Sequence, residues 1–158
     1  MTVQAAAPTA SILVAGIGNV FLGDDAFGIR VVERLGAQGL PRSVHVADFG
    51  IRGLDLAYAL LEPHTLTILV DATPRDWLPG TLYVLDLEPD GLPEFDTHAI
   101  DPANVLRLVA ALGGQPGRIV LVGCEPASID GYALSPGVTA AIEPACDLIR
   151  QLIDRGYA

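Results

Sequence analysis

The stretch from Gly16 to Gly28 reads GIGNVFLGDDAFG and directly follows an apolar run, SILVA, at residues 11–15. An apolar run that ends in glycines and continues into a helical pattern is typical of a β-strand joined to an α-helix by a tight loop. Loops of this form often hold phosphate, because the free N–H groups at a helix start favour anions. Here two carboxylates, Asp24 and Asp25, stand at the helix start. The stretch therefore predicts an α/β fold with an acidic site beside its first strand.

The same loop matches the dinucleotide-binding fingerprint G-x-G-x-x-G only in part, because Phe21 stands where the third glycine belongs. The acidic residue that would bind ribose, Asp48, comes about 30 residues after Gly18, where the fingerprint has about 20. Asp24 and Asp25 would also repel a pyrophosphate. A nucleotide-binding domain stays open as a weaker alternative, which predicts affinity for NAD or FMN.

Apolar runs and helical patterns alternate along the rest of the chain. The run LTILVDA at residues 66–72 is apolar enough for a central strand buried on both faces. Residues 74–80 are too few for a crossover helix, so the strand at 81–87 should pair antiparallel. Further strands are expected at 11–17, 44–49 and 118–125. We expect a three-layer α/β/α sandwich with a five-stranded, mostly parallel sheet and one antiparallel strand.

Helical spacing predicts which side chains each helix buries. The last helix should begin after Ser135 as N-cap, with Pro136 at its first position, and Pro144 should kink or restart it. The predicted buried stripes of the earlier helices are Gly28, Val31, Val32 and Leu35, then Leu54, Ala57, Tyr58 and Leu61, then Val105, Leu108, Val109 and Leu112.

The bulk properties of the 158 residues favour one folded domain over residues 1–158, with a flexible N-terminal segment at 1–10. A net charge of -10 excludes nucleic acid and anionic lipid as favoured partners. With no basic leader and no apolar segment near the roughly 20 residues of a membrane span, we expect no membrane association and a cytoplasmic protein. Cys124 and Cys146 lack C-x-x-C spacing, so we expect small buried hydrophobic side chains.

The two adjacent aspartates need separate explanations, because neighbours on a helix point about 100° apart. Asp24 is explained as an N-cap or first-turn acid that interacts with the helix dipole. Asp25 follows the strand at 11–17, and Asp71 ends the strand at 66–72. Because the carboxyl ends of parallel strands meet at one edge, where ligands bind in open α/β sheets, Asp25 and Asp71 should lie at the same edge.

An aspartate directly after an apolar strand is costly to bury unless it is paired, hydrogen-bonded or metal-bound. Asn19 is a candidate hydrogen-bond partner at this edge. The ten residues 88–97 can span up to about 33 Å, enough to bring His98 back over the sheet edge. His45, among valines in a strand, and His64, after a proline in a turn, are expected to be structural or solvent-facing.

Asp25, Asp71 and His98 form a candidate site with two open chemistries. Two carboxylates and an imidazole suit a divalent transition metal with free coordination positions. The same groups could run acid-base hydrolysis without a metal. A cysteine hydrolase through Cys124 and His98 is a further alternative, although nothing near Cys124 in the sequence would activate its thiol.

From Ile12 to about Ile153 the chain resembles the [NiFe]-hydrogenase maturation endopeptidases, which trim the C-terminal extension of the hydrogenase large-subunit precursor. The resemblance rests on five segments, of which the first and last together are specific. They are GIGNVFLGDDAFGIRVVERL at 16–35, DFGIRGLDL at 48–56, LVDA at 69–72, DTHAI at 96–100 and LVGCEPASIDGYALSPGVTAAIEPA at 121–145.

The resemblance implies that Asp25, Asp71 and His98 match the family's metal-binding trio and its catalytic centre. It implies nickel, supplied by the precursor and recognised before the cut, and it implies the large-subunit precursor as the partner of a monomeric protease. The family's DGGTxG loop, which helps to hold the precursor, reads Asp48-Phe49-Gly50-Ile51-Arg52-Gly53 here, so it departs from the family at Phe49, Ile51 and Arg52. The alternative is a nickel-binding escort that docks on the same precursor without cutting it.

Overall fold

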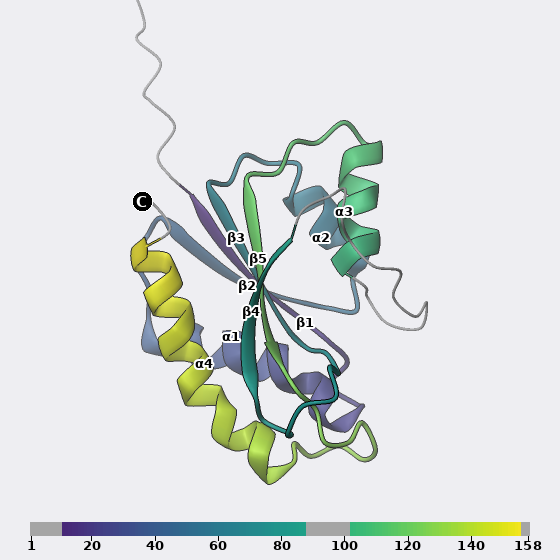
Figure 1. The fold of residues 1–158 in the computed structure, drawn as a ribbon. Helices are drawn as coiled ribbons and strands as arrows, with labels where there is room; N and C mark the ends of the chain where they lie inside the picture. Colours follow the sequence, from purple (N-terminus) through teal and green to yellow (C-terminus); the bar gives the residue numbers. More distant parts are fainter. Residues whose placement is uncertain (1–10, 88–101, 156–158) are drawn as a thin grey trace, which may run out of the picture.

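The computed structural model describes residues 11–87 and 102–155 of the chain (Figure 1). None of the helices in these residues has the length and apolar character that a membrane crossing requires. The elements in chain order are β1 (Ile12–Ile17), the 3-10 helix η1 (Gly23–Ala26), α1 (Phe27–Gln38), β2 (Val44–Gly50), α2 (Gly53–Ala59), β3 (Leu66–Ala72), β4 (Leu82–Leu87), α3 (Pro102–Ala111), β5 (Arg118–Cys124) and α4 (Pro136–Arg155).

One five-stranded sheet forms the middle layer, in the order β2-β1-β3-β5-β4. β1 pairs parallel with β2 and β3, β3 pairs parallel with β5, and β4 pairs antiparallel with β5. Helices α1 and α4 cover one face, and α2 and α3 cover the other (Figure 1). The predicted sandwich and its antiparallel strand are confirmed.

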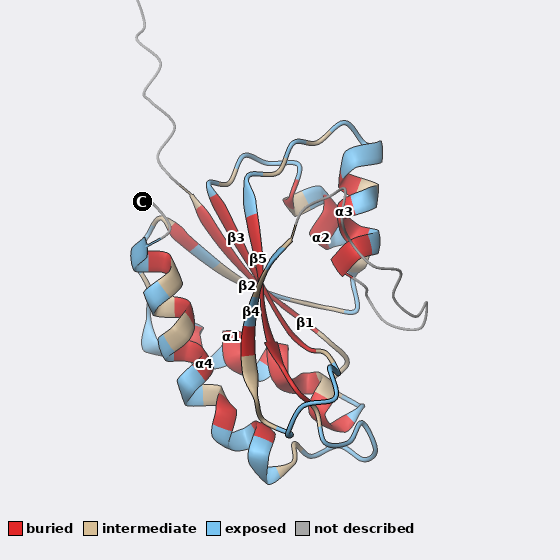
Figure 2. Cartoon of the chain, in the orientation of Figure 1, coloured by how far each residue is buried: buried red, intermediate tan, exposed pale blue. Residues whose placement is uncertain are grey.

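Successive side chains of the central strands point to opposite faces of the sheet, so each strand contributes to the core on both faces. In β3, Ile68 and Val70 face the cluster under α1 and α4, whereas Leu69 faces the cluster under α2 and α3. Every residue of β1 and β3 is buried, as Figure 2 shows by the red colour along these strands. A sheet covered on both faces explains why the sequence of β3 shows no polar alternation.

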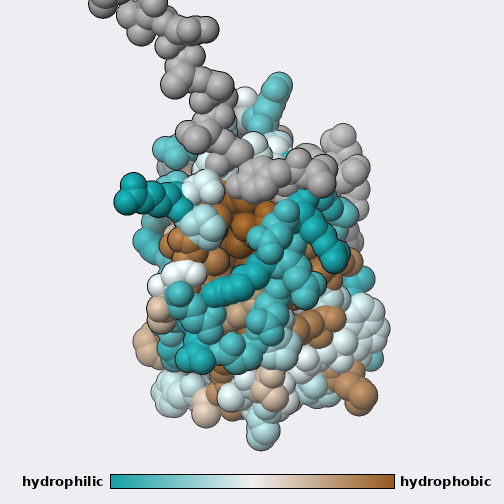
Figure 3. Space-filling view, turned by 90° about the vertical axis from the view of Figure 1, so that its left-hand side faces the viewer, coloured by the Kyte–Doolittle hydropathy of each residue, from teal (hydrophilic) through white to brown (hydrophobic). Residues whose placement is uncertain are grey.

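The α1 and α4 side of the molecule carries charged and polar side chains over the packed helices (Figure 3). Arg34 of α1 forms an ion pair with Glu143 of α4, and Arg150 donates a hydrogen bond of 2.7 Å to Gln38. The predicted buried stripe of α1 is confirmed, because Gly28, Val31, Val32 and Leu35 are all buried.

The predicted buried stripe of α2 holds only for Ala57. Leu54 is 54%, Tyr58 55% and Leu61 37% exposed, and Leu56 and Leu60 are buried instead. The apolar residues of GLDLAYALL fit two helical stripes almost equally well, so periodicity alone could not select the buried one. In α3 the prediction holds for Val105 and Val109, but Leu112 follows the end of the helix and is exposed, with Leu106 buried instead.

Helix α4 begins at Pro136, directly after Ser135, as predicted, and continues without a restart through Pro144. Pro144 has no N–H to donate to the carbonyl of Ala140, four residues earlier. Both residues lie on the exposed side of the helix. Water can hydrogen-bond the freed carbonyl, and therefore the proline does not end the helix.

Candidate catalytic site

The order of the strands places a topological switch point between β1 and β3. The chain leaves β1 to form β2 on one side and then crosses to form β3 on the other side, so the loops after β1 and β3 diverge. Ligands of open α/β sheets bind at such a switch point, outside the carboxyl ends of the strands. Asp25 follows β1 through η1, and Asp71 is the penultimate residue of β3. We call this end of β1 and β3, with Asp25 and Asp71, the acidic edge.

Glycines allow α1 to start directly against the ends of β1 and β3. A Cβ on Gly28 would lie 2.1 Å from the carbonyl oxygen of Val70 and 2.5 Å from that of Ile17. A Cβ on Gly18, whose φ is +139°, would lie 1.9 Å from the carbonyl oxygen of Asp25. No other residue fits at these two positions without moving the helix. The glycine loop therefore brings Asp25 to the end of β3, where Asp71 lies.

Asp25 is partly buried, and its Oδ2 accepts a 2.8 Å hydrogen bond from the backbone N–H of Asn19. Burial raises the pKa of the Asp25 carboxyl, and the hydrogen bond from Asn19 opposes this increase. Asn19 thus contacts Asp25 through its backbone N–H and not through its side chain. Its side-chain oxygen accepts a 2.9 Å hydrogen bond from the N–H of Phe21. A partly desolvated carboxylate of this kind is stabilised by a nearby cation.

Asp71 is only 6% exposed and stands in a row across the sheet with Gly123 and Tyr83. The Tyr83 ring fills the space above Gly123, where a Cβ would lie 2.2 Å from the Tyr83 Cζ. The Tyr83 hydroxyl donates a 2.8 Å hydrogen bond to the carbonyl oxygen of Thr73. Burial raises the pKa of Tyr83, Arg75 opposes this effect, and the Asp71 carboxylate adds to it. The phenol of Tyr83 therefore lies within electrostatic reach of Asp71.

Asp24 lies in the first turn of η1, which is one of its two predicted positions, but its carboxylate does not cap a helix. No side-chain hydrogen bond caps η1 or α1. The fully buried Asp24 carboxylate instead accepts bonds from the N–H groups of Ala127, Ser128 and Ser135, at 2.8, 3.0 and 2.7 Å, and from the Ser135 hydroxyl at 2.8 Å. Burial works to raise the pKa of Asp24, but these bonds together lower it. Asp24 fastens the loop between β5 and α4 to η1.

The third predicted ligand, His98, lies outside the described residues, and its place at the acidic edge stays a prediction. Across 11–87 and 102–155 no group of three or more His, Cys, Asp or Glu side chains is arranged to hold a metal. His45 is exposed on β2, and the His64 ring is hydrogen-bonded to Ser11 Oγ at 3.2 Å and to the carbonyl of Ala59 at 3.1 Å. The expectation that His45 and His64 are solvent-facing or structural is confirmed.

Both cysteines are buried and free, as predicted. Burial, followed by the charges of Asp24 and Glu125, raises the pKa of Cys124 to about 12. The thiol stays protonated at neutral pH, and a protonated thiol is a poor nucleophile. This environment argues against the cysteine-hydrolase alternative.

Known proteins share this sequence and fold. Residues 29–152 match the model of a family described as hydrogenase maturation protease. The hydrogenase 2 maturation protease of Escherichia coli K12 is 34% identical over 145 residues, which cover 87% of each chain. The HupD hydrogenase expression/formation protein of Rhodobacter capsulatus is 34% identical, over 89% of this chain and 70% of its own. The structure of the E. coli hydrogenase maturating endopeptidase HybD superposes with a TM-score of 0.78 at 33% identity, over 92% of this chain and 94% of that one.

Proposed function

The chain belongs to the hydrogenase maturation protease family, and from this premise we propose that it cuts a single protein substrate at its acidic edge. It is a hydrogenase maturation endopeptidase, which processes the large subunit of a [NiFe] hydrogenase. We propose that the cut removes the C-terminal extension of the large-subunit precursor after nickel has been inserted. The observation that carries this proposal is the position of Asp25 and Asp71 on both sides of the switch point in a chain of this family.

Asp25, Asp71 and His98 are the proposed ligands of the nickel that the precursor carries. Carboxylates and an imidazole suit a divalent transition metal. The carboxylates at the acidic edge fit this role. Burial raises the pKa of Asp25 because it disfavours the charged carboxylate, and a cation beside the carboxylate would offset that cost. A bound metal ion would polarise the scissile carbonyl or activate a water molecule.

Asp25 is also suited to accept a proton in the proposed reaction. Burial raises its pKa, and a carboxylate with a raised pKa is a stronger base at neutral pH. Its orientation is fixed by the N–H of Asn19, which binds Oδ2 and leaves Oδ1 for a water molecule.

The proposal is tested by incubating the purified protein with nickel-loaded precursor and weighing the products by mass spectrometry. The wild-type protein should shorten the precursor at its C-terminus, and nickel-free precursor should stay intact. Asp71→Ala and His98→Ala should abolish the cut, whereas His45→Ala, a matched loss of an imidazole from the exposed face of β2, should cleave as the wild type does. Complete cleavage by both site variants would exclude the assigned residues, and binding without any loss of mass would favour the escort alternative.

A further inference from the structure

The loop between β3 and β4 is fixed at its base by Glu125, a buried acid that directly follows β5. Glu125 is 5% exposed, and its Oε2 accepts a 2.6 Å hydrogen bond from the backbone N–H of Arg75. The Glu125 backbone closes the other side of the loop, because its carbonyl accepts a 2.8 Å bond from Gly80 and its N–H donates a 2.9 Å bond to Thr81. The loop begins two residues after Asp71, so its position is defined relative to the acidic edge.

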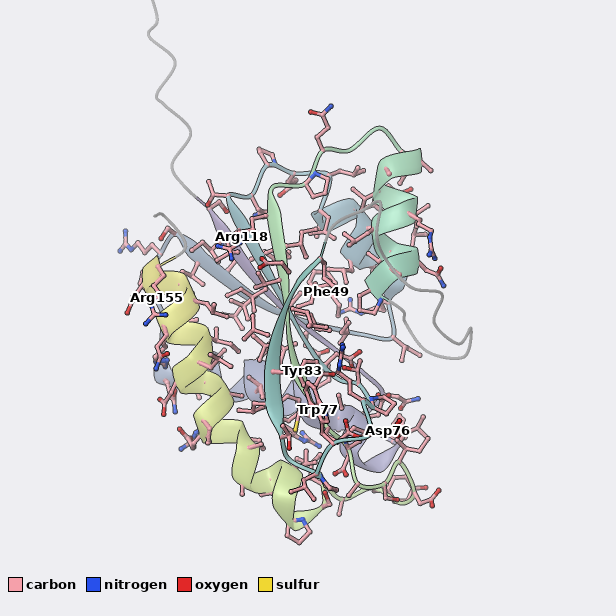
Figure 4. The ribbon with its side chains drawn as sticks, viewed as in Figure 1. Phe49, Asp76, Trp77, Tyr83, Arg118 and Arg155 are labelled. Carbon is pink, nitrogen blue, oxygen red and sulfur yellow. The ribbon has the colours of Figure 1, made fainter. Side chains whose placement is uncertain are left out.

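The guanidinium of Arg75 lies against two aromatic rings. Its Cζ is 5.4 Å from the centroid of the Trp77 ring and 5.2 Å from that of the Tyr83 ring. The rings themselves meet edge to face, with centroids 5.2 Å apart, and both are labelled in Figure 4. Cation–π contacts of this kind hold the guanidinium through its positive charge and do not occupy all five of its N–H donors. The side chain is thereby held in place before any ligand binds.

Within the described ranges no carboxylate forms an ion pair with Arg75. Arg30, Arg34, Arg52 and Arg118 are each paired with a carboxylate in the same ranges. In a chain of net charge -10, Arg75 is thus an exposed cation without a carboxylate partner there. It lies next to the acidic edge, because the Tyr83 ring on which it rests shares a cross-strand row with Asp71.

We propose that Arg75 binds a carboxylate on the C-terminal extension of the precursor and so sets which bond lies at the acidic edge. This inference rests on the proposed function. Arginine binds carboxylates through two parallel N–H bonds, and an arginine held on rings loses little freedom when it does so. The extension supplies such a group whatever its sequence, because it ends in the α-carboxylate of the precursor. In this arrangement the acidic edge binds the nickel of the precursor, and Arg75 binds a carboxylate of the C-terminal extension that is cut off.

The test separates binding of the extension from binding of the mature subunit. The kinetic constants kcat and KM are measured for cleavage of nickel-loaded precursor, and the processed subunit is measured as a competitive inhibitor. Arg75→Gln keeps the backbone bond to Glu125 and should raise KM by about tenfold or more, with kcat and the inhibition constant nearly unchanged. Arg75→Lys keeps the charge but not the paired N–H donors, and its KM should lie between that of the wild type and that of Arg75→Gln. Arg42→Gln, a matched loss of an exposed arginine before β2 at the opposite edge, should change none of these values.

An unchanged KM in Arg75→Gln would overturn the inference, as would an equal weakening of precursor and processed subunit. A fall in kcat alone would assign Arg75 to the cut itself and overturn it as well. Thermal unfolding of each variant shows whether the fold is intact. If the wild-type protein binds the precursor without cutting it, the proposed function fails. The inference on Arg75 is still tested in that case, because the affinity for the precursor can be compared with the affinity for the same subunit made without its extension.

Discussion

Two adjacent aspartates, Asp24 and Asp25, experience opposite electrostatic conditions in the same turn. Asp24 is surrounded by donors from the loop between β5 and α4, and these bonds lower its pKa. Asp25 has the N–H of Asn19 as its hydrogen-bond donor, and burial raises its pKa. The charge on Asp24 therefore stabilises the fold, whereas the charge on Asp25 is held at a free-energy cost that a cation would offset.

Asp24→Asn should lower the free energy of unfolding by about 2 to 3 kcal/mol, because charged hydrogen bonds are lost and buried N–H groups lose their acceptor. Since the folded pKa of Asp24 is lowered, its contribution is present above the ordinary pKa of 3.8 and is lost as the pH falls through the folded value. Urea unfolding at pH 7 and at decreasing pH measures both effects. The control Asp25→Asn should be as stable as the wild type or more stable, yet inactive. Equal destabilisation by the two variants would contradict this assignment.

Cys124 should be dispensable for cleavage and unreactive in the folded protein. Its pKa is raised to about 12 by burial and neighbouring charges, so the thiol should stay protonated even at pH 9, where an exposed cysteine is largely thiolate. Cys124→Ala should cleave precursor within about twofold of the wild-type rate. Iodoacetamide labelling at pH 9 should modify Cys124 only after unfolding in urea. Rapid labelling of the native thiol, with loss of cleavage, would restore the cysteine mechanism.

At the scale of elements, the contact between α1 and the sheet determines where Asp25 lies. Gly28→Ala should destabilise the fold and reduce cleavage, because the new Cβ would lie 2.1 Å from the Val70 carbonyl and push η1 away from β3. Gly36→Ala, in the same helix, meets no atom within 4 Å and should instead stabilise by about 0.5 to 1 kcal/mol. Thermal unfolding and precursor cleavage measure the two variants side by side. A Gly28→Ala variant with wild-type stability and activity would show that close packing here is not needed.

Most elements were predictable from the sequence, and the failures have a local cause. The bounds of β3 were predicted to the residue because the nearly all-apolar run LTILVDA is bounded by turns. The buried face of α2 was not predictable, because Leu54 and Leu56 are equally apolar and the way the chain leaves β2 decides between them. Periodicity finds a helix but does not orient one that is apolar on most sides.

The candidate site was predictable only where strand ends define it. Asp25 and Asp71 follow from the rule that carboxyl ends of parallel strands share an edge. The role of Asp24 depends on donors 103 to 111 residues away, and the position of Arg75 depends on Tyr83 from the antiparallel strand. Such contacts arise only after the sheet has formed, and no spacing in the sequence encodes them.

At the scale of the whole molecule, the strand order brings Asp25 and Asp71, which are 46 positions apart in the sequence, to the ends of neighbouring strands. They reach the same edge because β1 and β3 are adjacent and parallel, although β2 lies between them in the sequence. The loops that follow β3 and β5 at this end are tied together through Glu125, and the loop after β5 is tied to η1 through Asp24. These contacts join η1 and the two loops into one connected framework around the acidic edge.

If both carboxylates act on one cation, their removal should not be additive. Asp25→Asn and Asp71→Asn should each lower kcat/KM for nickel-loaded precursor by about a hundredfold or more, and the double variant should lose little beyond the larger single effect, because groups that act as a unit fail together. The double-variant cycle is measured by mass spectrometry of cleavage time courses, with urea unfolding as the check on folding. Losses that multiply would mean that Asp25 and Asp71 act independently. The acidic edge would then consist of two separate groups rather than one site for the cation of the precursor.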